Sequence, residues 1–173
     1  MRILITNFHS IKNKGDLGIV LGLMSGLKLK YPQVTFSLIG REASESSWWK
    51  ERGVAFYTPF FQYQPKNRIS FLVFLFKYIA KLITARFSSS EVIDAYRQAS
   101  VVISKGGSFF REPGYRRNFL PVGILGHLHQ LSLARIFKKK VVMSAQSFGP
   151  INNYLTRLIL RLQFMRFCSI PQA

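Results

Sequence analysis

Residues 2–29 read RILITNFHSIKNKGDLGIVLGLMSGLKL, and this stretch decides the fold. Residues 2–7 are a short apolar run that predicts a β-strand, residues 8–15 are a polar loop ending in glycine, and residues 16–29 have the apolar spacing of a helix. A strand, a loop and a helix in this order form the first unit of a parallel α/β sheet. Asp16 stands where a helix N-cap is expected, because its carboxylate can accept backbone N–H groups of the first turn.

The rest of the chain repeats this alternation. Apolar runs at residues 34–39, 54–57, 101–104 and 140–145 predict further strands, and the segments between them predict helices. With right-handed crossovers, these units form a doubly wound, mostly parallel five-stranded Rossmann-like α/β sheet in the order 3-2-1-4-5. Sheets of this kind bind ligands at the carboxyl ends of their strands.

Two local patterns predict close packing. Gly18, Gly22 and Gly26 recur every four residues in the first helix, and glycine inside a helix costs roughly 1 kcal/mol relative to alanine. We therefore expect the helix backbone to lie very close to the sheet along this stripe. Trp48 and Trp49 are expected to be packing residues rather than a platform for sugars.

Residues 69–86 are the most apolar part of the chain, but Lys77 and Lys81 interrupt them. A membrane-spanning helix needs about 20 mostly apolar residues, so we do not expect one here. Three interpretations stay open. The segment is a basic amphipathic helix in a membrane interface, a buried crossover helix, or cover against an absent partner domain.

The charge is strongly unbalanced, with 25 Lys and Arg against 7 Asp and Glu and a net charge of +18. Such a balance concerns partners rather than fold. An anionic membrane surface, nucleic acid or an acidic remainder of a larger protein would each account for it. Because the basic residues are scattered, except for Lys138-Lys139-Lys140, and no nucleic-acid motif accompanies them, we favour the membrane surface and expect no nucleic acid.

Cysteine usage and the N-terminus point to a reducing compartment. Cys168 is the only cysteine, so the chain can form no internal disulfide. No secretory signal precedes the first strand. We therefore predict a cytoplasmic protein, peripheral at the inner face of the membrane if residues 69–86 lie on it. The three histidines, His9, His127 and His129, have no cysteine partners at metal-ligand spacing, so no metal is expected.

Three short loops follow apolar strands: NKGD at residues 13–16, KGGS at 105–108 and AQSFGP at 145–150. Their order and spacing resemble the polysaccharide pyruvyl transferase family. That family has an N-x-G-D loop after its first strand, a strand ending in Gly-Gly about ninety residues later, and then a strand ending in Q-S-[IF]-G-P. The resemblance covers essentially the whole chain.

The resemblance implies two Rossmann-like domains facing each other, as in GT-B glycosyltransferases. It implies that phosphoenolpyruvate is the donor, without a further cofactor, and that a sugar or lipid-linked oligosaccharide is the acceptor of a pyruvate ketal. In the family, the Arg and His residues that handle phosphoenolpyruvate lie in the C-terminal half. We therefore expect residues 1–173 to be the N-terminal, acceptor-side half of such an enzyme, a truncated or frame-shifted product without the C-terminal domain and inactive alone.

Asp16 is the candidate catalytic residue, as a base or orienting group for an acceptor hydroxyl, beside its expected cap role. His127 and His129 are interpreted as ordinary helix residues. Two other functions stay open: half of a GT-B-like glycosyltransferase using a sugar nucleotide, and a non-catalytic basic module at a membrane surface. The candidate substrate-binding residues are Asn13, Gly15, Gly106, Gly107, Ser108, Gln146, Ser147 and Gly149.

Overall fold

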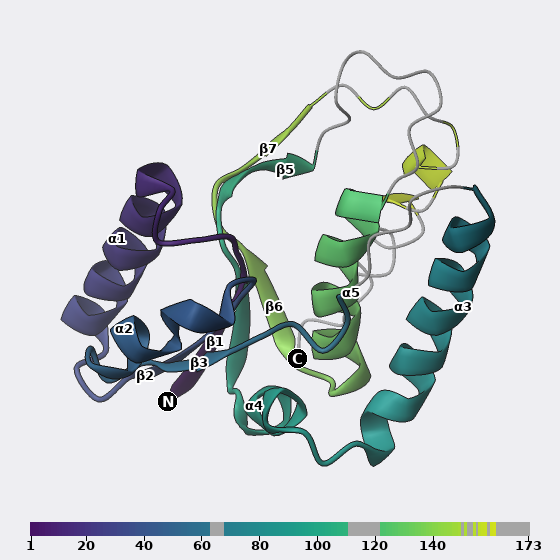
Figure 1. The fold of residues 1–173 in the computed structure, drawn as a ribbon. Helices are drawn as coiled ribbons and strands as arrows, with labels where there is room; N and C mark the ends of the chain where they lie inside the picture. Colours follow the sequence, from purple (N-terminus) through teal and green to yellow (C-terminus); the bar gives the residue numbers. More distant parts are fainter. Residues whose placement is uncertain are drawn as a thin grey trace.

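A computed structural model describes residues 1–62, 68–110 and 122–149, together with 151, 154, 156–158, 160 and 161. Within these residues the main sheet has five strands, all parallel, in the order β3-β2-β1-β4-β6 (Figure 1). This confirms the predicted fold class and strand order. The strands are β1 (Arg2–Phe8), β2 (Thr35–Gly40), β3 (Ala55–Tyr57), β4 (Val101–Ser104) and β6 (Lys140–Met143).

A small second sheet was not predicted. β5 (Gly107–Phe110) and β7 (Gln146–Phe148) pair in parallel, with Gly107 opposite Gln146. We expected the residues after β4 and β6 to be loops, and this expectation was wrong. Figure 1 shows the two chain segments leaving the main sheet and continuing side by side. Adjacent extended segments satisfy their backbone N–H and C=O groups by pairing, whatever their own strand propensity.

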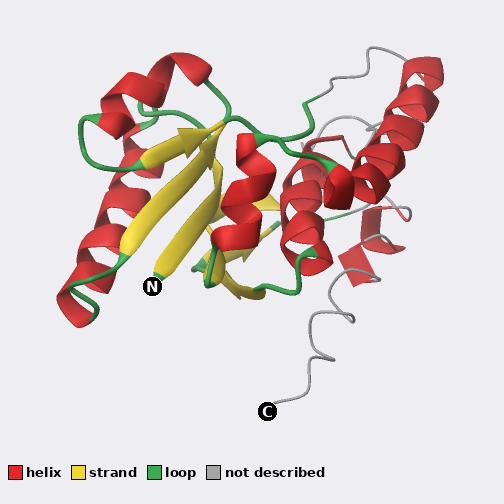
Figure 2. Ribbon diagram, turned by 90° about the horizontal axis from the view of Figure 1, so that it is seen from below, coloured by secondary structure: helices red, strands yellow, loops and turns green. Residues whose placement is uncertain are grey.

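Helices cover both faces of the main sheet (Figures 1 and 2). α1 and α2 pack on one face, α4 and α5 pack on the other, and α3 packs against α5. In the predicted last helix, residues 152–167, the described positions 154, 156–158, 160 and 161 are helical and the others lie outside the described residues. The helices are α1 (Lys14–Lys30), α2 (Ser46–Lys50), α3 (Arg68–Thr84), α4 (Glu91–Gln98) and α5 (Val122–Ile136), with 3-10 helices η1 (Ala43–Glu45) and η2 (Ala85–Phe87).

The core follows from the alternation of side chains along β1. Ile3 and Ile5 face α1 and α2, whereas Leu4 faces α4. Trp49 is completely buried in the first of these layers, and its ring lies 5.3 Å from that of Phe8 in an edge-to-face contact. The expected packing role of Trp49 is therefore confirmed.

The glycine stripe of α1 does not touch the sheet, so the predicted close packing was wrong. Gly18, Gly22 and Gly26 are exposed, and a Cβ built on any of them would meet no described atom within 4 Å. The buried residues of this helix are Val20 and Met24. Positions two residues apart on a helix point in nearly opposite directions, so burying Val20 and Met24 turns the glycines toward solvent.

Candidate active site

The central strands β1 and β4 end side by side at the carboxyl edge of the sheet. Thr6 is opposite Ser104 in the register, and the Lys105 backbone N–H donates to the Thr6 carbonyl at 3.0 Å. The loop after β1 is held by Glu45, whose Oε1 accepts the Ser10 hydroxyl at 2.5 Å and the Ile11 N–H at 2.8 Å. These hydrogen bonds hold the backbone at the carboxyl edge of the sheet in place.

A buried ion pair lies at this edge. The ammonium of Lys105 bonds the carboxylate of Asp16, the third residue of α1. The Lys105 side chain is 1% exposed and that of Asp16 is 16% exposed. A buried charge is tolerated only with a partner, so Asp16 secures Lys105. Asp16 is the member of the pair that a ligand can reach.

The prediction that Asp16 is the N-cap was wrong. The helix begins two residues earlier, at Lys14, and Asn13 is the cap: its Oδ1 accepts the Asp16 backbone N–H at 3.3 Å. Asn and Asp cap helices about equally well, and Asn13, three positions before Asp16, was not considered for this role. With Asn13 in that role, the Asp16 side chain is available for Lys105.

Asn7, the seventh residue of the chain, connects β1 to α5. Its backbone has φ +66°, which is uncommon outside glycine, and its N–H donates to Gln130 Oε1 at 2.9 Å. Its side-chain Nδ2 donates to Ser104 Oγ at 3.0 Å, and its Oδ1 lies 3.0 Å from His127 Nδ1. Because Oδ1 can only accept, the proton of this contact belongs to His127 Nδ1.

His127 is neutral at physiological pH. Burial, together with the positive charges of Arg41, Lys105 and His9, lowers its pKa to about 3. With the proton on Nδ1, the Nε2 atom of the ring carries the lone pair. Asn7, Asp16, Lys105 and His127 are called the edge cluster below.

The glycines after β4 shape the backbone at this edge. A Cβ on Gly106 would lie 2.8 Å from the Ala145 carbonyl oxygen, and Gly107 has φ +136°. Gly106 thus allows β4 and β6 to remain close as they leave the main sheet.

Replacing Gly106 by alanine should therefore destabilise the protein by about 1–3 kcal/mol, since a backbone carbonyl must move to admit the methyl group. Urea unfolding followed by circular dichroism measures the change. Gly22→Ala is the matched control, because its methyl group would point into open space and alanine is the better helix former by roughly 1 kcal/mol. Equal stability of Gly106→Ala and the wild type would contradict the close approach.

The other predicted residues are placed as follows. Gly15 is in the first turn of α1, and a Cβ there would meet only Asn13 Oδ1 among described atoms, at 3.4 Å. Ser147 is exposed in β7, and Gly149 follows that strand. The backbones of Ser108 and Gln146 belong to β5 and β7, and their side chains lie outside the described residues, as does Pro150.

Sequence reasoning did not single out Asn7, Lys105 or His127. Lys105 had a signal, because it directly follows the mostly apolar run Val101–Ser104, and a lysine that is buried there needs an acid nearby. No sequence signal indicated His127, because it is 120 positions from Asn7 and no local pattern predicts their contact. His129 fits the expectation of an ordinary helix residue, with its ring 4.9 Å from that of Tyr78.

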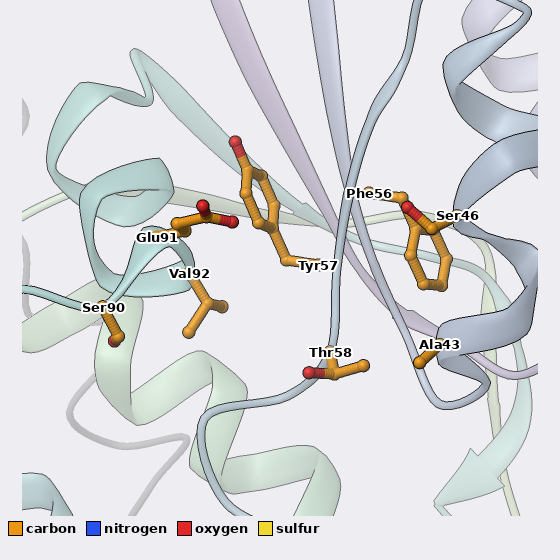
Figure 3. Close-up of a pocket in the computed structure, with 8 residues that line it drawn as sticks. All are labelled: Ala43, Ser46, Phe56, Tyr57, Thr58, Ser90, Glu91 and Val92. Carbon is orange, nitrogen blue, oxygen red and sulfur yellow. The ribbon is translucent and has the colours of Figure 1, made fainter.

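An open pocket of about 440 Å³ lies at the carboxyl end of β3 (Figure 3). Figure 3 shows Phe56 and Tyr57 on opposite sides of the strand, with Glu91 on the side of Tyr57. Aromatic rings beside hydroxyls and a carboxylate are a lining suited to sugars. The lining residues are Ala43, Ser46, Phe56, Tyr57, Thr58, Ser90, Glu91 and Val92.

A parallel α/β sheet with a polar cluster at its carboxyl edge defines a doubly wound ligand-binding domain. The sequence profile of the polysaccharide pyruvyl transferase family matches residues 13–170, and the chain belongs to that family. The resemblance inferred from the three loops is thereby confirmed. The amylovoran biosynthesis protein AmsJ of Erwinia amylovora is 25% identical over 183 residues, which cover 98% of this chain and 42% of AmsJ. No solved structure matches the chain.

Proposed function

We propose that this chain is the N-terminal, acceptor-side domain of a polysaccharide pyruvyl transferase with a GT-B-like two-domain architecture. The observation that carries the proposal is the Asp16 carboxylate, held by buried Lys105 at the ligand-binding edge of a chain of this family. The donor is phosphoenolpyruvate, no further cofactor takes part, and the acceptor is a sugar or a lipid-linked oligosaccharide.

The reaction joins two hydroxyls of one sugar to the central carbon of phosphoenolpyruvate. A proton adds to the methylene carbon, which becomes a methyl group, and the first hydroxyl oxygen bonds to the central carbon. Phosphate leaves with its bonding electrons, the second hydroxyl takes its place, and both hydroxyl protons are released. Such chemistry needs an acceptor of hydroxyl protons and cations for the phosphate.

The edge cluster supplies the first of these two requirements, a group that can accept the hydroxyl proton. Asp16 can accept a hydrogen bond from the attacking hydroxyl, and Lys105 fixes the position of its carboxylate. The low pKa of His127, about 3, keeps its imidazole neutral, so His127 is not the base for a hydroxyl. Arg41 and His9 are exposed at the same edge and favour an anionic donor.

The pocket at β3 supports an acceptor longer than one sugar. β3 is separated from β1 only by β2, and neighbouring strands lie about 4.8 Å apart, so the pocket is about 10 Å from the end of β1. An oligosaccharide placed with one sugar at the edge cluster would reach Tyr57 and Glu91 with another. A monosaccharide would not.

The family profile matches 158 residues, 13–170, and AmsJ is matched over 42% of its length. We therefore expect the 173-residue chain to bind acceptor without turning over donor. Titration with a methyl hexoside that carries a free diol, followed by NMR, should shift signals of Asp16 and His127. The analogue lacking one hydroxyl should bind about tenfold more weakly, since each hydrogen bond to a charged group contributes about 1.5–3 kcal/mol.

Two variants show whether hexoside binding depends on the Asp16–Lys105 pair or falls with the loss of any carboxylate. The variant Asp16→Asn, Lys105→Met should lose the binding, and Asp94→Asn, which removes an exposed carboxylate of α4, should keep it. Incubation with phosphoenolpyruvate and an oligosaccharide should release no phosphate. Phosphate release by this chain, or hexoside binding that survives loss of the Asp16 carboxylate, would refute the proposed acceptor-side role.

A further inference from the structure

Helix α3 has two different apolar faces. Its inner face carries Phe71, Phe74 and Tyr78, which are buried together with Leu125 of α5. This packing ties the helix to the domain. The interpretation of residues 69–86 as a buried helix thus holds for the inner face only, and the outer face is exposed. No helix in the described part of the chain has the length and hydropathy that crossing a bilayer requires.

The outer face of α3 is apolar and exposed. Phe76 is 75% exposed and Phe87, in η2 directly after the helix, is 86% exposed. Residues at spacings of three and four share one face of a helix, so the exposed residues form a continuous stripe. Figures 1 and 2 both show α3 at the periphery of the domain, away from the main sheet. The stripe consists of Leu72, Phe76, Ile79, Ile83 and Phe87.

The charge around this stripe has one sign. Residues 53–90 contain no aspartate or glutamate, and their basic residues are Lys66, Arg68, Lys77, Lys81 and Arg86. Lys77 and Lys81 are exposed on α3, and the Lys81 ammonium lies over the Phe60 ring, 4.6 Å from its centroid. Lysine side chains placed beside an apolar helix face can bury their stems while their ammonium groups reach lipid phosphates.

We propose that the outer face of α3, with Phe87, docks the protein on an anionic lipid surface. A protein partner would cover an apolar stripe equally well, but the absence of acidic residues over residues 53–90 and the net charge of +18 complement lipid phosphate. The aromatic and branched side chains enter the headgroup boundary, and the lysines remain at its level. The docking needs no activity of the edge cluster.

Co-sedimentation with vesicles tests the proposal on the 173-residue chain. Vesicles with about one third phosphatidylglycerol should bind it, and pure phosphatidylcholine vesicles should not, because each basic group near an anionic surface strengthens binding about fivefold. Raising the salt from about 0.05 to 0.5 M should weaken the binding. Phe76→Ser with Ile83→Ser should weaken it at least about tenfold.

The matched variants are on α1, which lies across the main sheet from α3 (Figure 1). Leu29 is 87% exposed there, and Lys28 and Lys30 are exposed beside it. Leu29→Ser should leave vesicle binding unchanged. Lys77→Gln with Lys81→Gln should weaken binding about 25-fold, and Lys28→Gln with Lys30→Gln should change it little.

Three results would overturn the proposal. They are equal binding to neutral and anionic vesicles, equal losses from the α1 and α3 variants, and self-association of the chain that Phe76→Ser abolishes. Circular dichroism of each variant shows that it is folded, as expected for changes at exposed side chains.

Discussion

Replacing Asp16 by asparagine is expected to lower the free energy of unfolding by about 3 kcal/mol. The substitution leaves the buried Lys105 ammonium without its carboxylate, and removing one member of a buried ion pair costs about 3–5 kcal/mol. We take the lower end because Asp16 is partly exposed. Urea unfolding measures the change, and Glu91→Gln, in the first turn of α4, is the control. That exposed carboxylate should contribute less than about 0.5 kcal/mol.

A double-mutant cycle isolates the pair. Lys105→Met alone also breaks the contact, and Asp16→Asn with Lys105→Met removes both charges and should recover most of the lost stability. A coupling energy above about 1 kcal/mol is the expected result. If the effects of Asp16→Asn and Lys105→Met simply add, the ion pair does not contribute to stability.

Lowering the pH should destabilise the protein already at pH values above those at which carboxylates ordinarily titrate. Burial lowers the pKa of both His127 and His129 to about 3, against an ordinary value near 6.5, so the unfolded chain binds protons more readily between these values. This contribution to stability is fully present above pH 6.5 and is lost as the pH falls toward 3. Between pH 6.5 and 5, each histidine should cost about 2 kcal/mol.

The variant His129→Phe tests this pH dependence. His129 lies between the rings of Phe61 and Tyr78, at 5.1 and 4.9 Å, and its buried Nε2 has no hydrogen-bond partner among the described residues. Phenylalanine removes both the proton site and the unsatisfied nitrogen. Thermal unfolding between pH 5 and 7 should therefore depend about half as steeply on pH. An unchanged slope in His129→Phe, equal to that of His9→Gln at an exposed position, would contradict the assignment.

The main sheet was predictable because local signals and global fold agree. Each strand of the main sheet is a mostly apolar run that is followed by a polar residue, and right-handed crossovers then leave few strand orders. The β5–β7 sheet was not predictable, since its pairing depends on where β4 and β6 end rather than on its own residues. The exposed glycines of α1 were misread because periodicity reveals stripes but not which stripe faces the core.

The candidate site was predictable in position but only partly in chemistry. The loops at Asn13 and Gly106 lie at the carboxyl edge of the sheet, where the sequence predicted them, and Asp16 was selected there. Its partner Lys105 was overlooked because charged residues in short loops are usually solvated. The contact of His127 with Asn7 joins residues 120 positions apart, and no local pattern reports such a distance.

The central position of β1 has a consequence for synthesis of the protein. One edge of β1 can pair as soon as Thr35, the partner of Arg2, has been synthesised. The other edge stays unpaired until Val101, the partner of Ile3, has been synthesised. At about 5–20 residues per second, roughly 3–13 s separate the synthesis of Thr35 from that of Val101. During that time an apolar strand has an open edge that can pair with other chains. The residue that begins the fold is among the last to be enclosed, so the nascent chain should depend on chaperones until β4 emerges.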